Sequence, residues 1–259
     1  VGIAEQTCAG VAAGLATLGK IPFISTYAVF GSMRMIEQIR QSICYPNLNV
    51  KIACSHGGLT PANDGGSHQG IEDMGIMRTL PNMRVIMGAD YNATRKLVAQ
   101  MAKTKGPAYI RFTRDAVPGI YDEDEEFTIG EAKTLRGGSD ITIIAVGDVM
   151  MLALNAADKL NEIGISTRVL DMHTIKPIDD KAILKAMAET RGIITVEDHN
   201  IINGLGSAVC EVACEHGGFP VHRIGIKDRF GESGPYETLL KEHDITIDEI
   251  ISKAKLLLI

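Results

Sequence analysis

The chain has 259 residues, a formal net charge of −6 and an apolar fraction of 45%. This length allows one large domain or two medium-sized domains, each with its own core. The negative charge, with no block of Lys and Arg, argues against a surface that neutralises nucleic-acid phosphates. No apolar run is long enough to cross a bilayer. We therefore expect a cytoplasmic globular protein that binds neither nucleic acid nor membrane.

Short β-branched runs alternate along the chain with amphipathic helical patterns. The predicted strands cover residues 22–25, 49–54, 83–87, 108–112, 140–146, 166–170, 192–197 and 221–225. The predicted helices cover residues 5–18, 32–44, 71–80, 92–103, 149–163, 179–189, 205–216, 236–241 and 247–258. This alternation is typical of mostly parallel sheets with helices on both faces, so the predicted fold class is α/β.

A run of five acidic residues at 122–126 marks a change in composition. Adjacent like charges repel one another and stay solvated. We therefore predict two domains, residues 1–120 and 139–259, joined by an acidic linker at 121–138. Asp90 is the expected N-cap of the helix that follows it, and Thr246 is the expected N-cap of the last helix.

Glu5 begins a helix that is otherwise apolar and rich in small residues. A lone acid at this position is either a charge that stabilises the helix N-terminus or a carboxyl group held in an apolar site. An apolar site raises the pKa of a carboxyl group because it disfavours the anion. The small residues on several faces of the helix also predict both dense packing within the layer over the sheet and burial at a subunit interface.

Polar, glycine-rich segments that contain His56, Asp64 and His68 follow the strand predicted at 49–54. Parallel α/β proteins bind ligands at this end of their strands. Neither histidine has a partner at metal-binding spacing, so no metal site is expected here. Arg114 follows the strand predicted at 108–112, and its guanidinium can bind two phosphate oxygens at once. Arg111 is an alternative for that role.

Arg34 and Gln69 are weaker candidates, because either could be an ordinary surface or packing residue.

Several motifs, taken in order, resemble the C-terminal half of a transketolase. They lie at residues 1–6, 27–30, 37–40, 64–73, 80–83 and 114–118. Residues 139–258, with glycine motifs at 204–206 and 231–234, resemble the transketolase C-terminal domain. The resemblance implies a pyrimidine-binding fold followed by that domain. Members of the family have a strand and a helix before the position of Glu5, so we expect the first domain to be short at its N-terminus.

The resemblance implies thiamine diphosphate as cofactor and transfer of a two-carbon ketol unit between sugar phosphates, as in the pentose phosphate pathway. By the same resemblance, Glu5 hydrogen-bonds a ring nitrogen of the aminopyrimidine and acts in catalysis. The matching aromatic residues that pack on this ring are Tyr27 and Phe30. His68 matches a catalytic histidine near the reacting carbon and the transferred group, so the resemblance implies that it also binds the substrate.

The remaining matches concern the substrate. Asp64 matches a residue that binds a substrate hydroxyl, and His56 and Arg114 match residues that hold the sugar phosphate.

The family's Gly-Asp-Gly signature for Mg²⁺ and diphosphate is not found, because Gly147-Asp148 continues to Val149. The resemblance therefore implies that a second, N-terminal subunit binds the diphosphate and most of the Mg²⁺ coordination sphere. We expect this chain to self-associate through both of its domains and to form a heterotetramer with that subunit. The C-terminal domain is expected to support subunit contacts and to contribute no catalytic residue.

Two alternatives remain within the thiamine-diphosphate enzymes: a 1-deoxyxylulose-5-phosphate synthase-like chain and the beta subunit of a 2-oxoacid dehydrogenase. An alternative of another class is a non-catalytic assembly subunit that keeps the fold.

Overall fold

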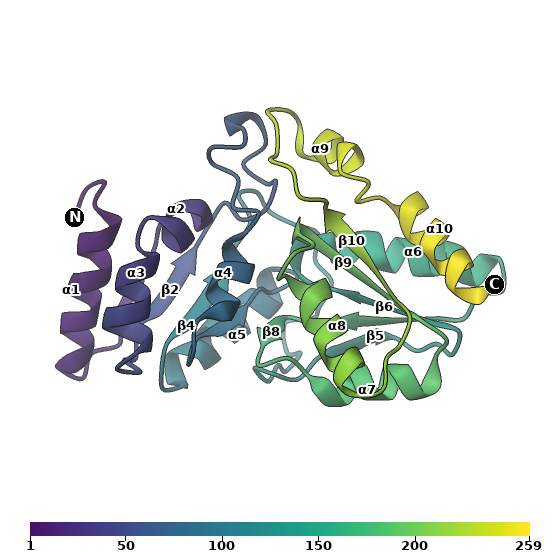
Figure 1. The fold of residues 1–259 in the computed structure, drawn as a ribbon, viewed down its shortest axis with the longest axis horizontal. Coiled ribbons are helices and arrows are strands. Elements are labelled where there is room, and N and C mark those ends of the chain that lie inside the picture. Colours follow the sequence, from purple (N-terminus) through teal and green to yellow (C-terminus); the bar gives the residue numbers. More distant parts are fainter.

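The computed structural model describes residues 1–259, which form two α/β units side by side, each with a five-stranded sheet (Figure 1). In spatial order, the first sheet contains β1 (Phe23–Ile24), β2 (Lys51–Cys54), β4 (Ala108–Arg111), β3 (Arg84–Ile86) and β8 (Thr174–Lys176). The second contains β10 (Val221–Ile226), β9 (Ile193–Asn200), β6 (Ile141–Ala145), β7 (Thr167–Asp171) and β5 (Lys133–Arg136). Only the edge strands β8 and β5 run antiparallel. The predicted α/β fold class is confirmed.

Helices cover both sheets. Those of the first unit are α1 (Glu5–Thr17), α2 (Ala28–Met33), α3 (Ile36–Gln38), the π-helix η1 (Ile39–Cys44), the 3₁₀ turn η2 (Ala62–Asp64), α4 (Asp73–Thr79) and α5 (Tyr91–Lys103). Those of the second are the 3₁₀ turn η3 (Gly147–Val149), α6 (Met150–Glu162), α7 (Asp180–Glu189), α8 (Leu205–Glu215), α9 (Tyr236–Glu242) and α10 (Ile247–Leu258). None of these helices has the length and apolar character needed to cross a membrane.

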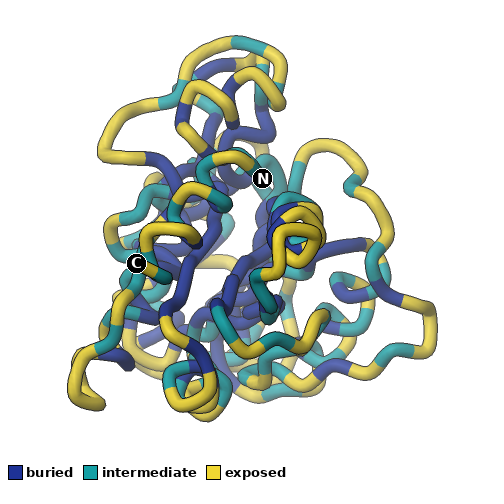
Figure 2. Tube along the Cα trace, turned by 90° about the vertical axis from the view of Figure 1, so that its right-hand side faces the viewer, coloured by how far each residue is buried: buried dark blue, intermediate teal, exposed yellow.

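Strand β8 joins the two units, because it follows β7 of the second sheet in sequence but pairs with β3 of the first. Buried side chains form two hydrophobic clusters, and each cluster draws residues from both units. Successive side chains of β4 point to opposite faces, so Tyr109 joins one cluster while Ala108 and Ile110 join the other. Figure 2 shows the buried residues in the middle of the molecule and the exposed ones on the outer helices and loops.

Three local predictions need correction. The helix predicted at 32–44 is divided among α2, α3 and η1, and Met35 interrupts it with φ −115° and ψ 14°. The segment predicted to be a linker contains β5, which pairs with β7. Strand β8 was not predicted at all. The division into 1–120, 121–138 and 139–259 remains a proposal, with β5 now placed inside its middle segment.

Asp90 fixes the position of both a helix and a loop. As predicted, it caps α5, with Oδ1 accepting a hydrogen bond from the Ala93 amide at 2.8 Å. Its Oδ2 accepts hydrogen bonds from the amides of Ile120 and Tyr121 at 2.7 and 2.8 Å. The start of the acidic segment is thereby anchored against the first unit.

The acidic run at residues 122–126 is exposed at most positions, but the aromatic residues on either side of it, Tyr121 and Phe127, are buried. Tyr121 packs edge-on against Phe127 with ring centroids 4.8 Å apart. The Tyr121 hydroxyl donates a hydrogen bond of 2.7 Å to Asp171 at the end of β7. Burial raises the pKa of Asp171 to about 7. Tyr121 therefore supplies a hydrogen bond to a buried acid of the second sheet.

Replacement of Asp171 by asparagine tests this pKa. The wild-type carboxyl group binds its proton more tightly in the folded chain than in the unfolded chain, where the pKa is about 4. Its contribution to stability is therefore complete below pH 4 and is lost as the pH rises towards 7. Asp171→Asn should gain stability relative to wild type over that range, measured by urea denaturation at several pH values. The exposed Asp122→Asn serves as the control. A pH-independent difference between Asp171→Asn and wild type would contradict the assignment.

Candidate active site

The carboxyl ends of β1, β2 and β4 meet at one edge of the first sheet, as expected for neighbouring parallel strands. Tyr27 follows β1, and it forms an isolated bridge with Ser55, which follows β2. His56 comes next, and Arg114 follows β4. Segments far apart in the sequence thus bring these candidate residues to the same edge.

Four aromatic rings gather there. The rings of Tyr27 and His56 are stacked, with centroids 3.7 Å apart and an interplanar angle of 10°. Phe30 lies parallel to Tyr27 at 5.9 Å. His68, from the same connection between β2 and α4 as His56, meets Phe30 edge-on at 5.6 Å. The structure therefore places together the two aromatic residues and the two histidines that the sequence singled out.

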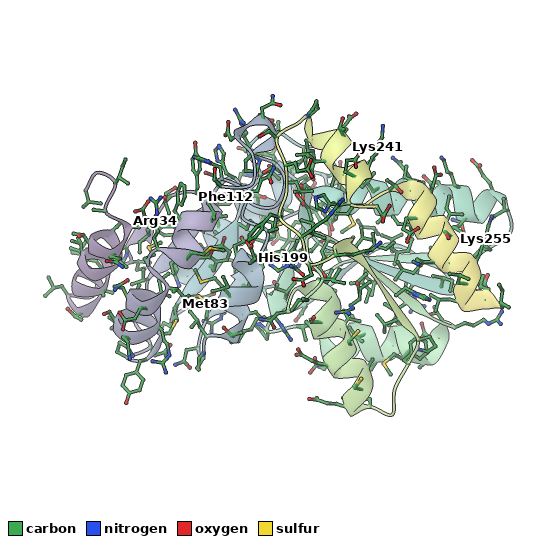
Figure 3. All side chains as sticks on the ribbon, turned by 45° about the horizontal axis from the view of Figure 1, so that its top comes forward. Arg34, Met83, Phe112, His199, Lys241 and Lys255 are labelled. Atoms are coloured by element: carbon green, nitrogen blue, oxygen red, sulfur yellow. The ribbon has the colours of Figure 1, made fainter.

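Glu5 lies beside this cluster, but its surroundings differ from the apolar site that we expected. Its side chain is 13% exposed, and its Oε1 is 3.2 Å from Nη1 of Arg34. The Arg34 guanidinium also lies 4.0 Å from the centre of the Phe30 ring. Glu5 and Arg34 line a depression of about 620 Å³ between the start of α1 and the end of α2. Figure 3 shows Arg34 in this part of the molecule.

Each of the two histidines has a serine as its immediate neighbour and hydrogen-bond partner. Nδ1 of His56 is 2.9 Å from the Ser55 hydroxyl, and Nδ1 of His68 is 3.0 Å from the Ser67 hydroxyl. These bonds use Nδ1 and leave Nε2 of each ring for a ligand. Burial lowers the pKa of His56, and the nearby Arg114 cation lowers it further. His56 also has φ +62°, a strained conformation that is concentrated at functional sites.

Asp64 and Arg114 form an ion pair at the same edge, with 3.1 Å between Asp64 Oδ2 and Arg114 Nη1. Arg114 Nη1 also donates to the carbonyl of Pro61 at 2.7 Å. Both charged side chains remain more than a third exposed. The pair is therefore accessible to a polar ligand.

Arg111, the alternative to Arg114, is excluded as a ligand-binding residue by its burial. Its side chain is fully buried, with Nη1 3.2 Å from Asp73 Oδ1 and Nη2 donating to the carbonyl of Asp198 at 2.7 Å. Gln69 is also buried, and it donates to the carbonyl of Glu232 at 2.9 Å. Both side chains are engaged within the protein.

The sequence did not indicate how closely the second unit approaches this edge. Both oxygens of Asp198 accept hydrogen bonds from the amide of Leu59, at 2.9 and 3.1 Å. His199 Nε2 accepts a hydrogen bond from the Gly75 amide, and it lies in the middle of the molecule (Figure 3). The ionisable residues Asp198 and His199 within the buried strand β9 were the signal in the sequence for such a contact, because buried ionisable groups need partners.

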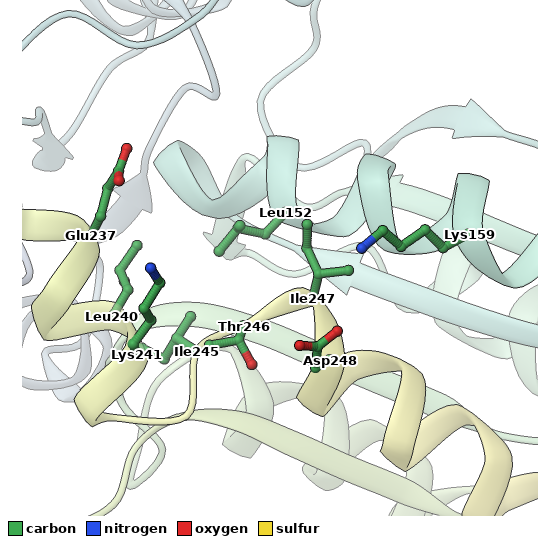
Figure 4. Close-up of a pocket in the computed structure, with 9 residues that line it drawn as sticks. All are labelled: Leu152, Lys159, Glu237, Leu240, Lys241, Ile245, Thr246, Ile247 and Asp248. Atoms are coloured by element: carbon green, nitrogen blue, oxygen red, sulfur yellow. The ribbon is translucent and has the colours of Figure 1, made fainter.

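Another cavity, of about 450 Å³, lies in the second unit between α6, α9 and α10 (Figure 4). Its lining includes Leu152, Leu240 and Ile247, and none of the predicted site residues. We assign no function to it.

The two arginines should respond differently to substitution by methionine. Arg111→Met leaves Asp73 buried without its cation, so the free energy of unfolding should fall by about 3–5 kcal/mol. Arg114→Met removes an exposed pair, and the loss should stay below about 1 kcal/mol. Urea denaturation of the full chain measures both values. Equal losses for the two variants would contradict their assigned environments.

Comparison with known proteins covers nearly the whole chain. Residues 1–119 match the family described as "Transketolase, pyrimidine binding domain", and residues 130–250 match "Transketolase, C-terminal domain". The chain is 46% identical over 255 residues to a putative transketolase C-terminal section from Methanocaldococcus jannaschii, covering 97% of this chain and 80% of that protein. It is 41% identical over 254 residues to a 6-deoxy-6-sulfo-D-fructose transketolase subunit from a Clostridium species, covering 98% and 79%.

A solved structure described as "Split gene transketolase, inactive beta4 tetramer" superposes with a TM-score of 0.94 at 46% identity, covering all of this chain and 83% of that one. The two matched domains account for both units of the fold, in the order in which they occur along the chain. The chain therefore belongs to the transketolase family, with a pyrimidine-binding domain followed by a transketolase C-terminal domain.

Proposed function

We propose that this chain is the C-terminal subunit of a split, thiamine-diphosphate-dependent transketolase. In this role it transfers a two-carbon ketol unit between sugar phosphates together with a diphosphate-binding subunit. The observation that carries the proposal is the position of Glu5 beside the cluster of Tyr27, Phe30 and two histidines. A carboxylate next to stacked aromatic rings suits a flat heterocycle that has hydrogen-bond donors.

The Arg34 guanidinium supports this fit, because it is itself flat and carries N–H donors. It donates to Glu5 while lying over the face of Phe30. Glu5 and Phe30 can therefore hold a planar donor group between them in this conformation. An aminopyrimidine has the same two properties, and stacking on an aromatic face contributes about 0.5–1.5 kcal/mol beyond the burial of area.

Each residue of the cluster has a distinct proposed role. When bound, thiamine diphosphate supplies the carbanion chemistry of the reaction. Glu5 would hold a proton at a ring nitrogen of the aminopyrimidine, and Tyr27 and Phe30 would fix the plane of that ring. His68 would hold or move a proton near the reacting carbon, because its Nδ1 is occupied by Ser67 and its Nε2 has no partner within the protein.

The substrate would bind at the exposed pair of Asp64 and Arg114. Asp64 can accept a hydrogen bond from a sugar hydroxyl, and Arg114 and His56 can bind a terminal phosphate. The Clostridium relative is named for a ketose that has a sulfo group. A phosphate and a sulfonate both present oxygens that a guanidinium binds, so we propose an anionic terminal group as the common feature of the substrates.

The partner subunit would supply the rest of the cofactor site. No group of three or more metal-binding side chains gathers in this chain. We therefore propose that the partner subunit provides most of the Mg²⁺ site. Helix α1 lies at the outer end of the molecule in Figure 1, and a Cβ at Gly10 or Gly14 would meet nothing within 4 Å. This bare, small-residue surface beside Glu5 supports self-association and assembly into a heterotetramer.

Glu5→Gln tests the proposal in the chain reconstituted with a transketolase N-terminal section from the same genome. Removal of the ionisable group should lower the rate of ketol transfer by at least about a hundredfold, the lower end of the range for general acid–base catalysis. The exposed Glu215→Gln on α8 is the matched control and should keep the wild-type rate. Thermal unfolding verifies that both variants fold.

Donor profiling completes the test. Wild-type enzyme should use a ketose phosphate as donor and not pyruvate. Preference for pyruvate would replace the proposal with a synthase or a 2-oxoacid dehydrogenase. Normal turnover of Glu5→Gln would remove Glu5 from the mechanism, and failure of the assembled pair to bind cofactor would favour a non-catalytic assembly subunit.

A further inference from the structure

We propose that the C-terminal domain positions the substrate-binding loop of the first domain, and that Gln69 and Gly231 are positioning residues for the reaction. The loop comprises residues 57–70 and contains Asp64 and His68. The inference rests on the proposed function, since it assigns a role to a domain for which the sequence predicted only subunit contacts. Figure 1 shows this loop beside the segment that leads into α9.

The first contact between the C-terminal domain and the loop is at the base of the loop, where residues 58 and 59 lie beside residue 70. The Gly58 amide donates to the carbonyl of Gly70 at 2.7 Å, which closes the loop on itself. Next to this bond, the Leu59 amide donates to the fully buried carboxyl group of Asp198 from β9. A backbone amide of the loop thus has its partner in the other domain.

The second attachment is at Gln69, beside His68. Gln69 is 2% exposed, and its Nε2 donates to the carbonyl of Glu232 at 2.9 Å. The same nitrogen approaches the carbonyl of Ala62 at 3.5 Å, so one side chain links both limbs of the loop to the C-terminal domain. Gln69 directly follows the candidate catalytic His68. Rotation of its side chain away from Glu232 would therefore free the backbone next to that histidine.

Glycines allow the two segments to approach this closely. A Cβ at Gly66 would lie 2.6 Å from the carbonyl oxygen of Gly231, and a Cβ at Gly65 would lie 2.5 Å from the hydroxyl of Ser233. A Cβ at Gly231 would overlap Oε1 of Gln69. The contact between residues 65–69 and residues 231–233 therefore depends on close packing of backbone and side-chain atoms that a single methyl group would disturb.

The loop needs this support because its own conformation is strained and open. Ala62 has φ +54°, which is unfavourable for a residue that has a Cβ. The charged pair of Asp64 and Arg114 is more than a third exposed, and an exposed pair contributes little to stability. The bonds to Asp198 and Glu232 thus add buried, directional restraints from the C-terminal domain to the hydrogen bonds within the loop itself.

Two variants test the inference, Gly231→Ala and Gln69→Glu. The first adds a methyl group against Gln69, and the second places a carboxylate against the Glu232 carbonyl. Gly234→Ala is the matched control in the same segment, because its Cβ would lie 3.6 Å from Leu239, an ordinary contact. Gly234 also has no positive φ.

Two measurements are made on each variant. Steady-state kinetics on the enzyme reconstituted with the N-terminal section give kcat, KM for the ketose phosphate and the affinity for thiamine diphosphate. Hydrogen exchange of the Gly58, Leu59 and His68 amides, measured on the full chain, reports the loop directly and requires no activity.

Both test variants should lose about tenfold to a hundredfold in kcat/KM, mainly through KM, since small misplacements have effects of that size. Their cofactor affinity should be unchanged, the loop amides should exchange faster, and Gly234→Ala should match wild type. Wild-type kinetics and exchange in both test variants would overturn the inference, as would a uniform loss of protection throughout the chain. Lack of transketolase activity in the wild-type pair would instead overturn the proposed function, and the exchange data would still decide the role of the loop contact.

Discussion

The buried guanidinium of Arg111 is the group on which the rest of the structure depends. It projects from the end of β4, pairs with Asp73 at the start of α4, and donates to the carbonyl of Asp198 in β9. A fully buried cation requires such partners, and removal of one leaves the other uncompensated. This one side chain therefore links the first sheet, its neighbouring helix and the second unit, at the same junction where β8 pairs with β3 and the two hydrophobic clusters are shared.

The loop at residues 57–70 packs against this arginine. A Cβ at Gly57 or Gly58 would overlap the Arg111 side chain, so the base of the loop packs against this side chain. The carboxyl group of Asp198, whose carbonyl binds Arg111, accepts the amide of Leu59. The same residues that join the two domains thus contact the loop that contains the candidate substrate ligands, and on this contact rests the proposed influence of the C-terminal domain on the reaction.

The features predicted from the sequence are those set by local chemistry. The apolar run at 141–145 forms the fully buried strand β6, and Asp90 and Thr246 cap α5 and α10 as expected. Strands β5 and β8 were missed because short edge strands have little apolar pattern and take their register from a distant partner. Likewise, the break in the helix predicted at 32–44 carries no glycine or proline signal.

The sequence identified the candidate residues but did not predict how they contact one another. The sequence identified Tyr27, Phe30, His56 and His68, and the structure brings their rings together. It did not reveal that Arg34 pairs with Glu5, because the two are 29 residues apart and nothing in either segment specifies the other. The attachment of the loop to the C-terminal domain depends on packing across the whole chain, which single motifs do not encode.

The central claim is that this chain holds one end of thiamine diphosphate and a second subunit holds the other. Calorimetric titration of thiamine diphosphate, with Mg²⁺ present, into the isolated chain, the isolated N-terminal section and their mixture tests it most directly. We expect tight binding in the mixture and weak or undetectable binding to either chain alone. Equally tight binding to this chain alone would contradict the division of the site, as would no binding by a mixture that has assembled.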